Sequence, residues 1–382
     1  MPQQLATAPR ILILGTGFGA LTAAREVRRR APRATITLVS PKAEFVFLPS
    51  LIWVPPGIRR GPELVIPLER YLQRHRLTHL AATVTGLSNN GRRVLTDQGP
   101  VDNDGLIIAT GGRFLKKMPG IEHALTLCEG VAAAQAIRAR LLALEEGAIA
   151  FGFGGNPQEP SAMRGGPMFE LLFGVDTWLR QQGKRQRFQL SFFNAAAEPG
   201  KRLGERAVAA LLGEMARRGI ATHLGQPIKG FSRQAVITAQ GDIPADLILF
   251  MPGLAGPDWA GECGIPLSPG GFFPADEFCA AQGLEHAFVA GDAGSYPGPD
   301  WLPKQAHMAD LQARAAAENL LRVLAGQAPI ARPRPELICI VDSVNAGTLV
   351  YRDLRRNFTL PSSRLFHWAK RYFEGHYLRA FR

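Results

Sequence analysis

The sequence predicts an α/β protein with two domains in which parallel strands alternate with helices, followed by a C-terminal appendage. Three observations support this prediction. The apolar run 11–14 ends in the glycine-rich stretch 15–20, a second strand and glycine turn begin near residue 148, and the chain beyond residue 328 becomes proline-rich and then basic and aromatic. Buried parallel strands typically appear as apolar runs bounded by glycine turns, with a helix connecting each strand to the next.

The first glycine turn directly follows the predicted strand. It consists of Gly15, Thr16, Gly17, Phe18, Gly19 and Ala20. A strand, a tight glycine turn and a helix together present backbone N–H groups to a pyrophosphate at the helix N-terminus. In the dinucleotide-binding motif G-x-G-x-x-G, Ala20 stands at the third glycine position. The motif alone is therefore weak evidence, and the second strand at 35–39 supports it. We therefore expect a dinucleotide cofactor.

The end of the second strand departs from the usual pattern. An acidic residue there normally holds a ribose hydroxyl, but Ser40, Pro41 and Lys42 follow the strand. A hydroxyl and an ammonium group can still bind ribose or phosphate, so these residues remain candidate cofactor contacts.

The remaining elements divide the chain into four segments. Residues 1–115 form the first part of one nucleotide-binding domain, which ends in an apolar strand and the glycines at 111 and 112. Residues 116–250 form a second Rossmann-like domain, with a helical stretch at 116–145 and a strand at 148–151 that runs into Gly152. Residues 251–327 return to the first domain, with a long helix at 305–324. Residues 328–382 begin with a proline-rich linker and contain a strand pair and amphipathic helices.

Composition narrows the function classes. The chain has 382 residues, 46% of them hydrophobic, and a net charge of +12. A basic chain favours an anionic partner, either a membrane surface or nucleic acid. Because no nucleic-acid recognition motif is visible, we expect no nucleic-acid partner. No apolar run approaches the roughly 18 residues of a membrane span. The N-terminus lacks a signal-peptide pattern, which favours the cytoplasmic face of the cell membrane.

The four cysteines are Cys128, Cys263, Cys279 and Cys339. Their wide spacing matches neither a zinc site nor a small disulfide-rich domain. We expect no metal, and we interpret the cysteines as buried thiols or redox groups, with Cys263 and Cys279 as loop or core thiols.

Three motifs together resemble the flavoprotein superfamily that contains two dinucleotide-binding domains. They are the turn at 15–20, the sequence Ala109-Thr110-Gly111, and the pair Gly291 and Asp292. The resemblance implies FAD, and we expect it to be non-covalent because the segment 45–54 contains no cysteine. The resemblance also implies that Asp292 bonds the ribityl chain and that the helix beginning near Lys304 directs its positive end at the flavin.

A narrower resemblance is to the sulfide:quinone oxidoreductases. The segment 45–54, which includes Leu48 and Pro49, resembles the segment beneath their flavin. Cys128 and Cys339 stand where the bacterial enzymes have their first and last cysteines, and the tail 367–373 resembles their membrane-binding end. The resemblance implies that Lys370 reaches the flavin, and that electrons pass from a small reduced sulfur species through FAD to a quinone.

One departure affects this interpretation. In the family, a central cysteine and the last cysteine form the disulfide that sulfide attacks, but residues 151–170 contain no cysteine. Ser161 cannot replace a thiol in this exchange. Two arrangements remain open: Cys339 acts alone and carries a persulfide, or it pairs with Cys128 if their Cα atoms lie within about 7 Å. Each cysteine can instead be a buried structural thiol.

Two other functions remain as alternatives. The first is a type II NADH:quinone dehydrogenase-like enzyme, although Pro157 disrupts the second glycine pattern and removes a backbone N–H there. Arg164, Gly165 and Gly166 can bind an anion or form a structural turn. The second alternative is a flavin-binding membrane protein without catalytic activity.

The C-terminal tail is the predicted partner-binding element. From residue 364 onward, apolar residues recur at helical spacing and basic residues flank them; the apolar set is Phe366, Ala369, Phe373, Tyr377 and Ala380, widened by Leu365, Trp368, Tyr372 and Phe381. This pattern is typical of a helix that lies on a lipid surface, from which a quinone is drawn. The alternative is a helix packed on its own domain or on a second subunit of a homo-oligomer.

Overall fold

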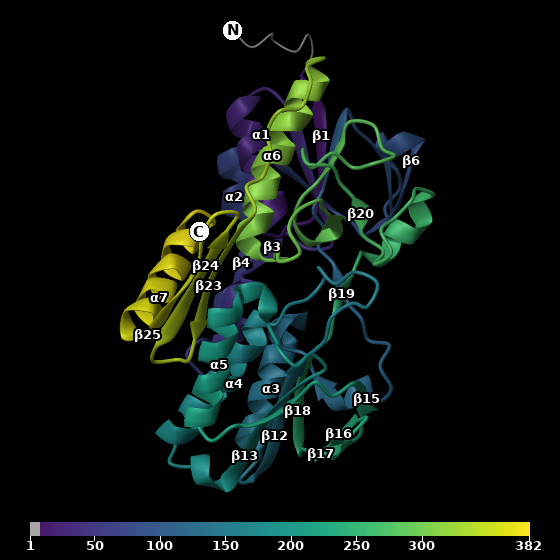
Figure 1. Ribbon diagram of the computed structural model, residues 1–382. Coiled ribbons are helices and arrows are strands. Elements are labelled where there is room, and N and C mark those ends of the chain that lie inside the picture. The colour runs from purple at the N-terminus through teal and green to yellow at the C-terminus, as the bar shows by residue number, and fades with distance from the viewer. Residues whose placement is uncertain (1–7) are drawn as a thin grey trace.

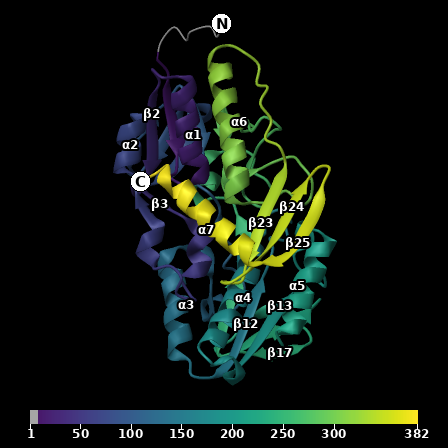
Figure 2. The ribbon, with the colours of Figure 1, turned by 90° about the vertical axis from the view of Figure 1, so that its left-hand side faces the viewer.

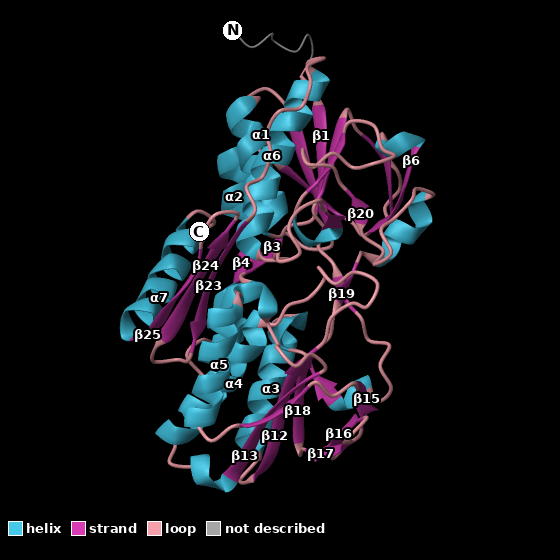
Figure 3. Ribbon diagram, in the orientation of Figure 1, coloured by secondary structure: helices cyan, strands magenta, loops and turns pink. Residues whose placement is uncertain are grey.

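The computed structural model describes residues 8–382, apart from the side chain of Cys128. Two parallel sheets lie one above the other, and a smaller antiparallel sheet packs beside them (Figure 1). Figure 3 shows that helices cover both parallel sheets. The α/β class predicted from the sequence is confirmed, and the two parallel sheets are typical of two Rossmann-like dinucleotide-binding domains.

The first parallel sheet has the strand order β21-β9-β1-β2-β5. Its strands are β1 (Arg10–Leu14), β2 (Thr35–Ser40), β5 (Thr78–Ala81), β9 (Gly105–Ile108) and β21 (Ala287–Val289). The helices that accompany this sheet are α1 (Phe18–Arg30), α2 (Glu69–His75) and α6 (Ala306–Leu324). Because β21 pairs with β9, the chain returns to this sheet after it has passed through the second one.

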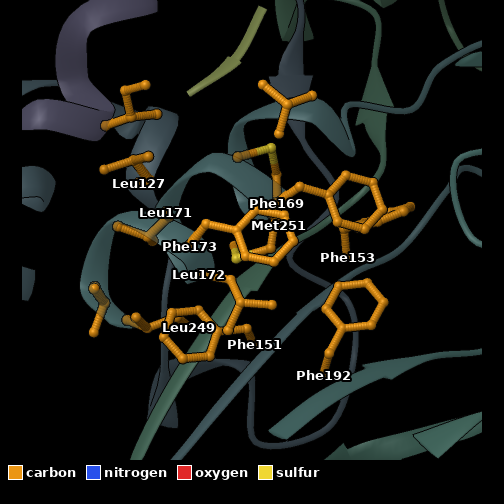
Figure 4. Close-up of a cluster of buried hydrophobic side chains, with 14 of the residues drawn as sticks. Leu127, Phe151, Phe153, Phe169, Leu171, Leu172, Phe173, Phe192, Leu249 and Met251 are labelled. Atoms are coloured by element: carbon orange, nitrogen blue, oxygen red, sulfur yellow. The ribbon is translucent and has the colours of Figure 1, made fainter. Parts of the chain in front are cut away.

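The second parallel sheet has the order β11-β18-β12-β13-β14. Its strands are β11 (Ala124–Leu125), β12 (Gly147–Phe153), β13 (Phe188–Asn194), β14 (Ala221–Leu224) and β18 (Leu247–Met251), and its helices are α3 (Val131–Ala143), α4 (Gly166–Gln181) and α5 (Glu205–Arg217). Aromatic side chains from β12, β13 and α4 fill the core between this sheet and its helices (Figure 4).

Short antiparallel sheets and pairs complete the two domains. They are formed by β3 (Glu44–Val46) with β4 (Val65–Pro67); β6 (Val84–Ser88), β7 (Arg93–Thr96) and β8 (Val101–Asp102); β10 (Arg113–Phe114) with β19 (Leu254–Ala255); and β15 (Ile228–Phe231), β16 (Ala235–Thr238) and β17 (Gly241–Pro244). The parallel pair β20 (Phe273–Pro274) and β22 (Gly294–Ser295) lies close to the first sheet.

The C-terminal segment forms a sheet and a helix. Within residues 8–382, the strands β23 (Glu336–Asp342), β24 (Gly347–Asp353) and β25 (Asn357–Ser363) form an antiparallel sheet, and α7 (Arg364–Arg379) crosses it (Figure 2). The sequence predicted two strands here, and the structure has a third, β25. Its Pro361 and polar residues do not give the alternating apolar pattern of a strand. The amphipathic helices predicted for residues 328–382 are the single helix α7. Strand β23 also contacts α4, so the appendage touches both parallel-sheet domains.

Two predicted boundaries are wrong. In the stretch 116–145 the α-helix is confined to α3, and the helices before it are short 3₁₀ helices, because Pro119, Gly120 and Gly130 interrupt these residues. The strand predicted to end at Phe151 continues through Gly152 to Phe153, where a methyl group on Gly152 would lie 2.5 Å from the ring of Phe193. The glycine at this position thus allows neighbouring strands to pack and does not form a turn.

Candidate functional site

The first glycine turn has the geometry of a dinucleotide cradle. Gly15 has a φ of +109°, and a methyl group there would lie 2.5 Å from the carbonyl oxygen of Ala109. Methyl groups on Gly17 and Gly111 would meet nothing within 4 Å, so the backbone is open to a ligand at both positions. Among the described residues, α1 has no side-chain cap and no acidic residue in its first turn. These features suit an anion at the helix N-terminus.

Thr110 adds an independent indication of a ligand. Its hydroxyl oxygen is buried and has no hydrogen-bond partner among the described residues. Buried polar atoms in folded proteins nearly always have a partner. Because Thr110 stands between Ala109 and the open Gly111, we conclude that the residues here fit a dinucleotide.

Replacing Gly15 with alanine is expected to lower the free energy of unfolding by about 1–3 kcal/mol, because the methyl group would collide with backbone at a positive φ. Urea unfolding of the cofactor-free protein measures this effect. Gly17→Ala is the matched control: its methyl group enters open space, so it should preserve stability while weakening dinucleotide binding. Equal stability of Gly15→Ala and wild type would contradict the close approach.

The other residues predicted to contact the cofactor near this turn range from buried to exposed. Ser40 is buried, and its hydroxyl group bonds the carbonyl of Lys42 at 2.8 Å and lies 3.0 Å from Nε2 of His79. Lys42 itself is exposed. Leu48 and Pro49 begin the 3₁₀ helix η1 (Leu48–Trp53) and are partly buried. A cofactor role for these residues stays a prediction.

Asp292 lies beside the cradle and pairs with Arg164. Asp292 belongs to the 3₁₀ helix η9 (Gly291–Ala293). Its carboxylate forms an ion pair with the Arg164 guanidinium. The preceding Gly291 donates its N–H to Gln312 on α6 at 3.0 Å. This contact holds the motif against the N-terminal half of α6.

Lys304 has an unusual environment. Its ammonium group donates to the carbonyl oxygens of Gly294 at 2.5 Å and Asp292 at 3.4 Å, and it lies 4.0 Å from the centre of the Phe272 ring. Burial lowers the pKa of Lys304 to about 7, and the positive charges of Arg164 and Arg202 contribute to the decrease. Such strongly shifted groups are common at functional sites.

Cys339 lies on β23 near the first turns of two helices. Its Sγ would be 3.8 Å from a methyl group on Gly166, the first residue of α4. Gln305, which precedes the first residue of α6, donates to the carbonyl of the adjacent Ile338 at 3.4 Å. Burial raises the pKa of the Cys339 thiol to about 12, with a further increase from the charge of Glu170. The thiol is therefore protonated at neutral pH.

Cys128 is the second candidate redox cysteine. It belongs to η5 (Leu127–Glu129), but its side chain lies outside the described part of the chain. The pairing of Cys128 with Cys339 thus stays a prediction. Cys279 is buried and Cys263 is partly buried, and neither forms a disulfide among the described residues.

A buried ion pair adjoins Cys339. Lys370 on α7 pairs with Glu170 on α4, and its ammonium group also donates to the carbonyl of Ile340 at 3.3 Å. Burial raises the pKa of Glu170 to about 7, although the charge of Lys370 opposes this increase. Glu170 can therefore exchange a proton near neutral pH. A contact of Lys370 with a flavin stays a prediction.

Further polar contacts hold the inner face of α7. The carboxylate of Asp342 accepts a hydrogen bond from Trp53 Nε1 at 3.0 Å and lies 2.7 Å from Nδ1 of His367. One turn beyond Lys370, Glu374 forms an ion pair with Arg59. These contacts join the C-terminal helix to residues 53–59 and to β23. Glu170, Asp342 and Glu374 were not predicted as site residues, although His367, Lys370 and Glu374 recur at helical spacing.

The outer face of α7 is apolar. Leu365, Trp368, Tyr372 and Phe373 are between 56% and 70% exposed. By contrast, Tyr377 and Phe381 pack with Phe18 and Phe45 in the core of the first domain. The predicted apolar face therefore includes residues from both sides of the helix. Among residues 8–382, no helix combines the length and apolarity needed to cross a bilayer.

The second glycine-rich segment does not form a tight phosphate-binding turn. Strand β12 ends at Phe153 and α4 begins at Gly166, so twelve residues separate them. Asn156 in this loop donates to the carbonyl of Leu254 at 2.9 Å, which holds the loop against β19. Glu159 accepts hydrogen bonds from the hydroxyl groups of Ser161, Ser268 and Ser295. The loop thus packs toward the first domain.

Comparisons with known proteins agree with this architecture. The model of the family described as pyridine nucleotide-disulphide oxidoreductase matches residues 9–313. The sulfide-quinone reductase of Aquifex aeolicus (strain VF5) is 22% identical over 403 residues, which cover 97% of this chain and 90% of the relative. The type II NADH:quinone oxidoreductase of Staphylococcus aureus (strain NCTC 8325 / PS 47) is 23% identical over 346 residues, 83% of each chain.

A solved structure has the same fold. The X-ray structure of the sulfide:quinone oxidoreductase from the hyperthermophilic bacterium Aquifex aeolicus superposes with a TM-score of 0.90 at 22% identity, covering 98% of this chain and 92% of that chain. At this level of identity, the superposition establishes the fold and does not identify the substrate.

Proposed function

Because the chain belongs to the pyridine nucleotide-disulphide oxidoreductase family, we propose that it is an FAD-dependent enzyme that passes electrons from a reduced sulfur species to a quinone. The observation that carries the proposal is the position of Cys339. Its sulfur faces the start of α4 and lies next to the residue that contacts Gln305 at the start of α6. A thiol at the N-terminus of a helix, here α4, is favourably placed for redox chemistry, because the helix dipole stabilises negative charge.

The residues around the first glycine turn would hold the FAD. The backbone at Gly15–Ala20 would bind the pyrophosphate, the Thr110 hydroxyl would gain its missing partner, and Asp292 would bond the ribityl chain. When bound, FAD supplies two-electron acceptance from the sulfur donor and donation to the quinone. Lys304 and the N-terminus of α6 would provide positive charge beside it.

Formation of a Cys339 thiolate requires a proton acceptor, since burial keeps the thiol protonated at neutral pH. Glu170 is the candidate proton acceptor. It lies close enough to the thiol for its negative charge to contribute to the raised pKa of Cys339. A pKa of about 7 allows Glu170 to accept a proton at neutral pH. Transfer to Glu170 would leave the thiolate and the Lys370 ammonium as the local charge pair.

The outer face of α7 supports a membrane as the source of the quinone. The helix buries His367 and Glu374, partly buries Lys370, and exposes Trp368 and Tyr372, the reverse of an ordinary surface helix. Aromatic residues with flanking arginines favour the interface of an anionic bilayer. We accordingly propose peripheral attachment through this face, with the quinone drawn from the adjoining lipid.

The first experiment is anaerobic reduction of the purified flavoprotein, followed by absorbance near 450 nm. Sulfide should bleach the flavin and a short-chain quinone should restore it, whereas Cys339→Ala should slow bleaching at least about tenfold, as expected for loss of a nucleophile. Cys263→Ala, which removes a thiol remote from this site, is the matched control. Bleaching by NADH, with none by sulfide, would overturn the proposal in favour of a type II NADH dehydrogenase.

A further inference from the structure

A cavity of about 390 Å³ lies between the second parallel-sheet domain and the C-terminal sheet, where α5 faces β25 (Figure 2). None of the residues that line this α5–β25 cavity belongs to the cofactor cradle or to the candidate redox site around Cys339. An adjoining hollow of about 620 Å³ shares Glu214, Arg217 and Arg218 with it. Because small-molecule sites occupy roughly 300–1,000 Å³, the cavity is large enough for a small organic ligand.

One wall of the cavity is a basic stripe on α5. Its members recur three or four residues apart and so share one face of the helix; they are Arg206, Ala210, Glu214 and Arg217. In the described part of the chain, Glu214 is the only carboxylate that lines the cavity, and it pairs with both Arg217 and Arg218. Arg206 forms no ion pair or hydrogen bond with any described residue. Three guanidinium groups thus line the cavity with a single carboxylate.

A second carboxylate close to this wall already has three partners. Asp176 on α4 lies 3.0 Å from Arg218 and also pairs with Arg180 and Arg185. It therefore does not neutralise Arg206. The wall carries an excess of positive charge, which favours an anionic ligand, and a guanidinium binds oxyanions through two parallel hydrogen bonds.

The opposite wall offers hydroxyl groups. Thr359 on β25 lies directly across from Val350 on β24, whose side chain is buried in the core, so both side chains point to the same face of the sheet. The Thr359 Oγ1 atom is buried and has no hydrogen-bond partner among the residues that the structure describes. Buried polar atoms nearly always have one. Since Thr359 lines the cavity, its hydroxyl group is an independent indication that a polar group of a ligand belongs there.

Buried apolar side chains complete the lining. Phe173 on α4, Leu211 on α5 and Val341 on β23 face the cavity and are each 3% exposed. A small inorganic ion would leave these side chains uncovered, whereas a ligand with a hydrocarbon part would cover them. The lining therefore suits a ligand that has an oxyanion at one end and an apolar part at the other.

We infer that the α5–β25 cavity binds a phosphate monoester with an apolar organic part, supplied either as phosphatidic acid in a membrane or as a soluble alkyl phosphate. A phosphate monoester has three strong acceptor oxygens and nearly two negative charges at neutral pH. Its oxygens can accept from Arg206 and Arg217 on one wall and from the Thr359 hydroxyl group on the other. This site is separate from the proposed redox centre, and the inference does not depend on the proposed function.

The test measures binding of hexyl phosphate to the FAD-loaded protein by calorimetry at pH 8 and constant ionic strength. Hexyl phosphate should bind at least about tenfold more tightly than inorganic phosphate, because its chain covers the apolar side chains. Arg206→Gln should raise the dissociation constant of hexyl phosphate at least about fivefold, through loss of a charge-assisted hydrogen bond. Arg29→Gln, at an exposed position on α1, is the matched control and should bind like wild type.

Thr359→Val keeps the shape of the side chain and removes the unpartnered hydroxyl group. It should raise the dissociation constant of hexyl phosphate about 3- to 10-fold. The urea midpoint of the protein without hexyl phosphate should stay the same or increase, since no hydrogen bond within the protein is lost. A lower midpoint would show that the hydroxyl group has a partner within the protein, and would contradict its role in binding.

Vesicles distinguish the two sources of the phosphate ester. Displacement of hexyl phosphate by vesicles of phosphatidylcholine with phosphatidic acid, but not by phosphatidylcholine alone, would identify the membrane lipid; no displacement would identify a soluble ester. Equal affinity for hexyl phosphate in wild type and Arg206→Gln, or equal affinity for hexyl phosphate and inorganic phosphate, would overturn the inference. Flavin reduction by sulfide should be unchanged in both variants, so a failure of the proposed function is recognised separately.

Discussion

Replacing Lys370 with methionine is expected to lower the free energy of unfolding by about 3–5 kcal/mol at pH 9, because it leaves the buried Glu170 without its counter-charge. The loss should shrink to about 1 kcal/mol at pH 6, where Glu170 is mostly protonated. Burial raises the pKa of Glu170 from its usual 4.5 to about 7. The contribution of Glu170 to the free energy of unfolding therefore falls as the pH rises from about 4.5 to about 7, and it is constant above pH 7.

Without Lys370 the pKa of Glu170 rises further, so the fall in stability continues above pH 7 at about 1.4 kcal/mol per pH unit. Urea unfolding at pH 6, 8 and 9 measures this difference. The double substitution Glu170→Gln and Lys370→Met should remove the pH dependence. Lys184→Met, which removes a surface pair with Glu145, should cost less than about 1 kcal/mol at each pH. A loss of equal size at pH 6 and pH 9 would show that Glu170 is not the responsible group.

Replacing Trp368 and Tyr372 together with serine should reduce binding to vesicles that contain acidic phospholipid at least about tenfold. Burying one large apolar side chain contributes about 1.5–3 kcal/mol, and the two rings are 60% and 70% exposed in the structure. Co-sedimentation of the protein with the vesicles measures the effect. The anaerobic reduction of flavin should be unchanged, since both rings point away from the inner face of α7.

Leu142→Ser is the matched control for this double substitution, because Leu142 is also exposed, at 53%, but lies on α3. It should leave vesicle binding unchanged. If the Trp368 and Tyr372 substitutions instead converted a dimer into a monomer, without any change in vesicle binding, the outer face of α7 would be a contact between two copies of the chain.

Much of the fold follows from local sequence patterns. The run Ile11–Leu14, the turn at Gly15–Ala20 and the strand that ends before Gly111 each predict their structure independently, because apolar periodicity and glycine conformation act over a few residues. The pair Gly291 and Asp292 is likewise followed by the long helix α6, which begins at Ala306, close to the predicted start at 305. Strand β25 was missed because Pro361 weakens the local pattern, and its pairing with β24 compensates.

The sequence by itself determined the two parallel-sheet domains, the dinucleotide cradle and the position of Cys339 on a strand, since each depends on neighbouring residues. Only the tertiary structure decided which side of α7 is buried. Helical spacing groups its apolar residues as one face, but Glu170, Asp342 and Arg59 lie far away in the sequence and attract Lys370, His367 and Glu374 inward. Ion pairs between distant segments have no local signature. For the same reason, only the folded chain could bring Arg164 to Asp292 and Lys304.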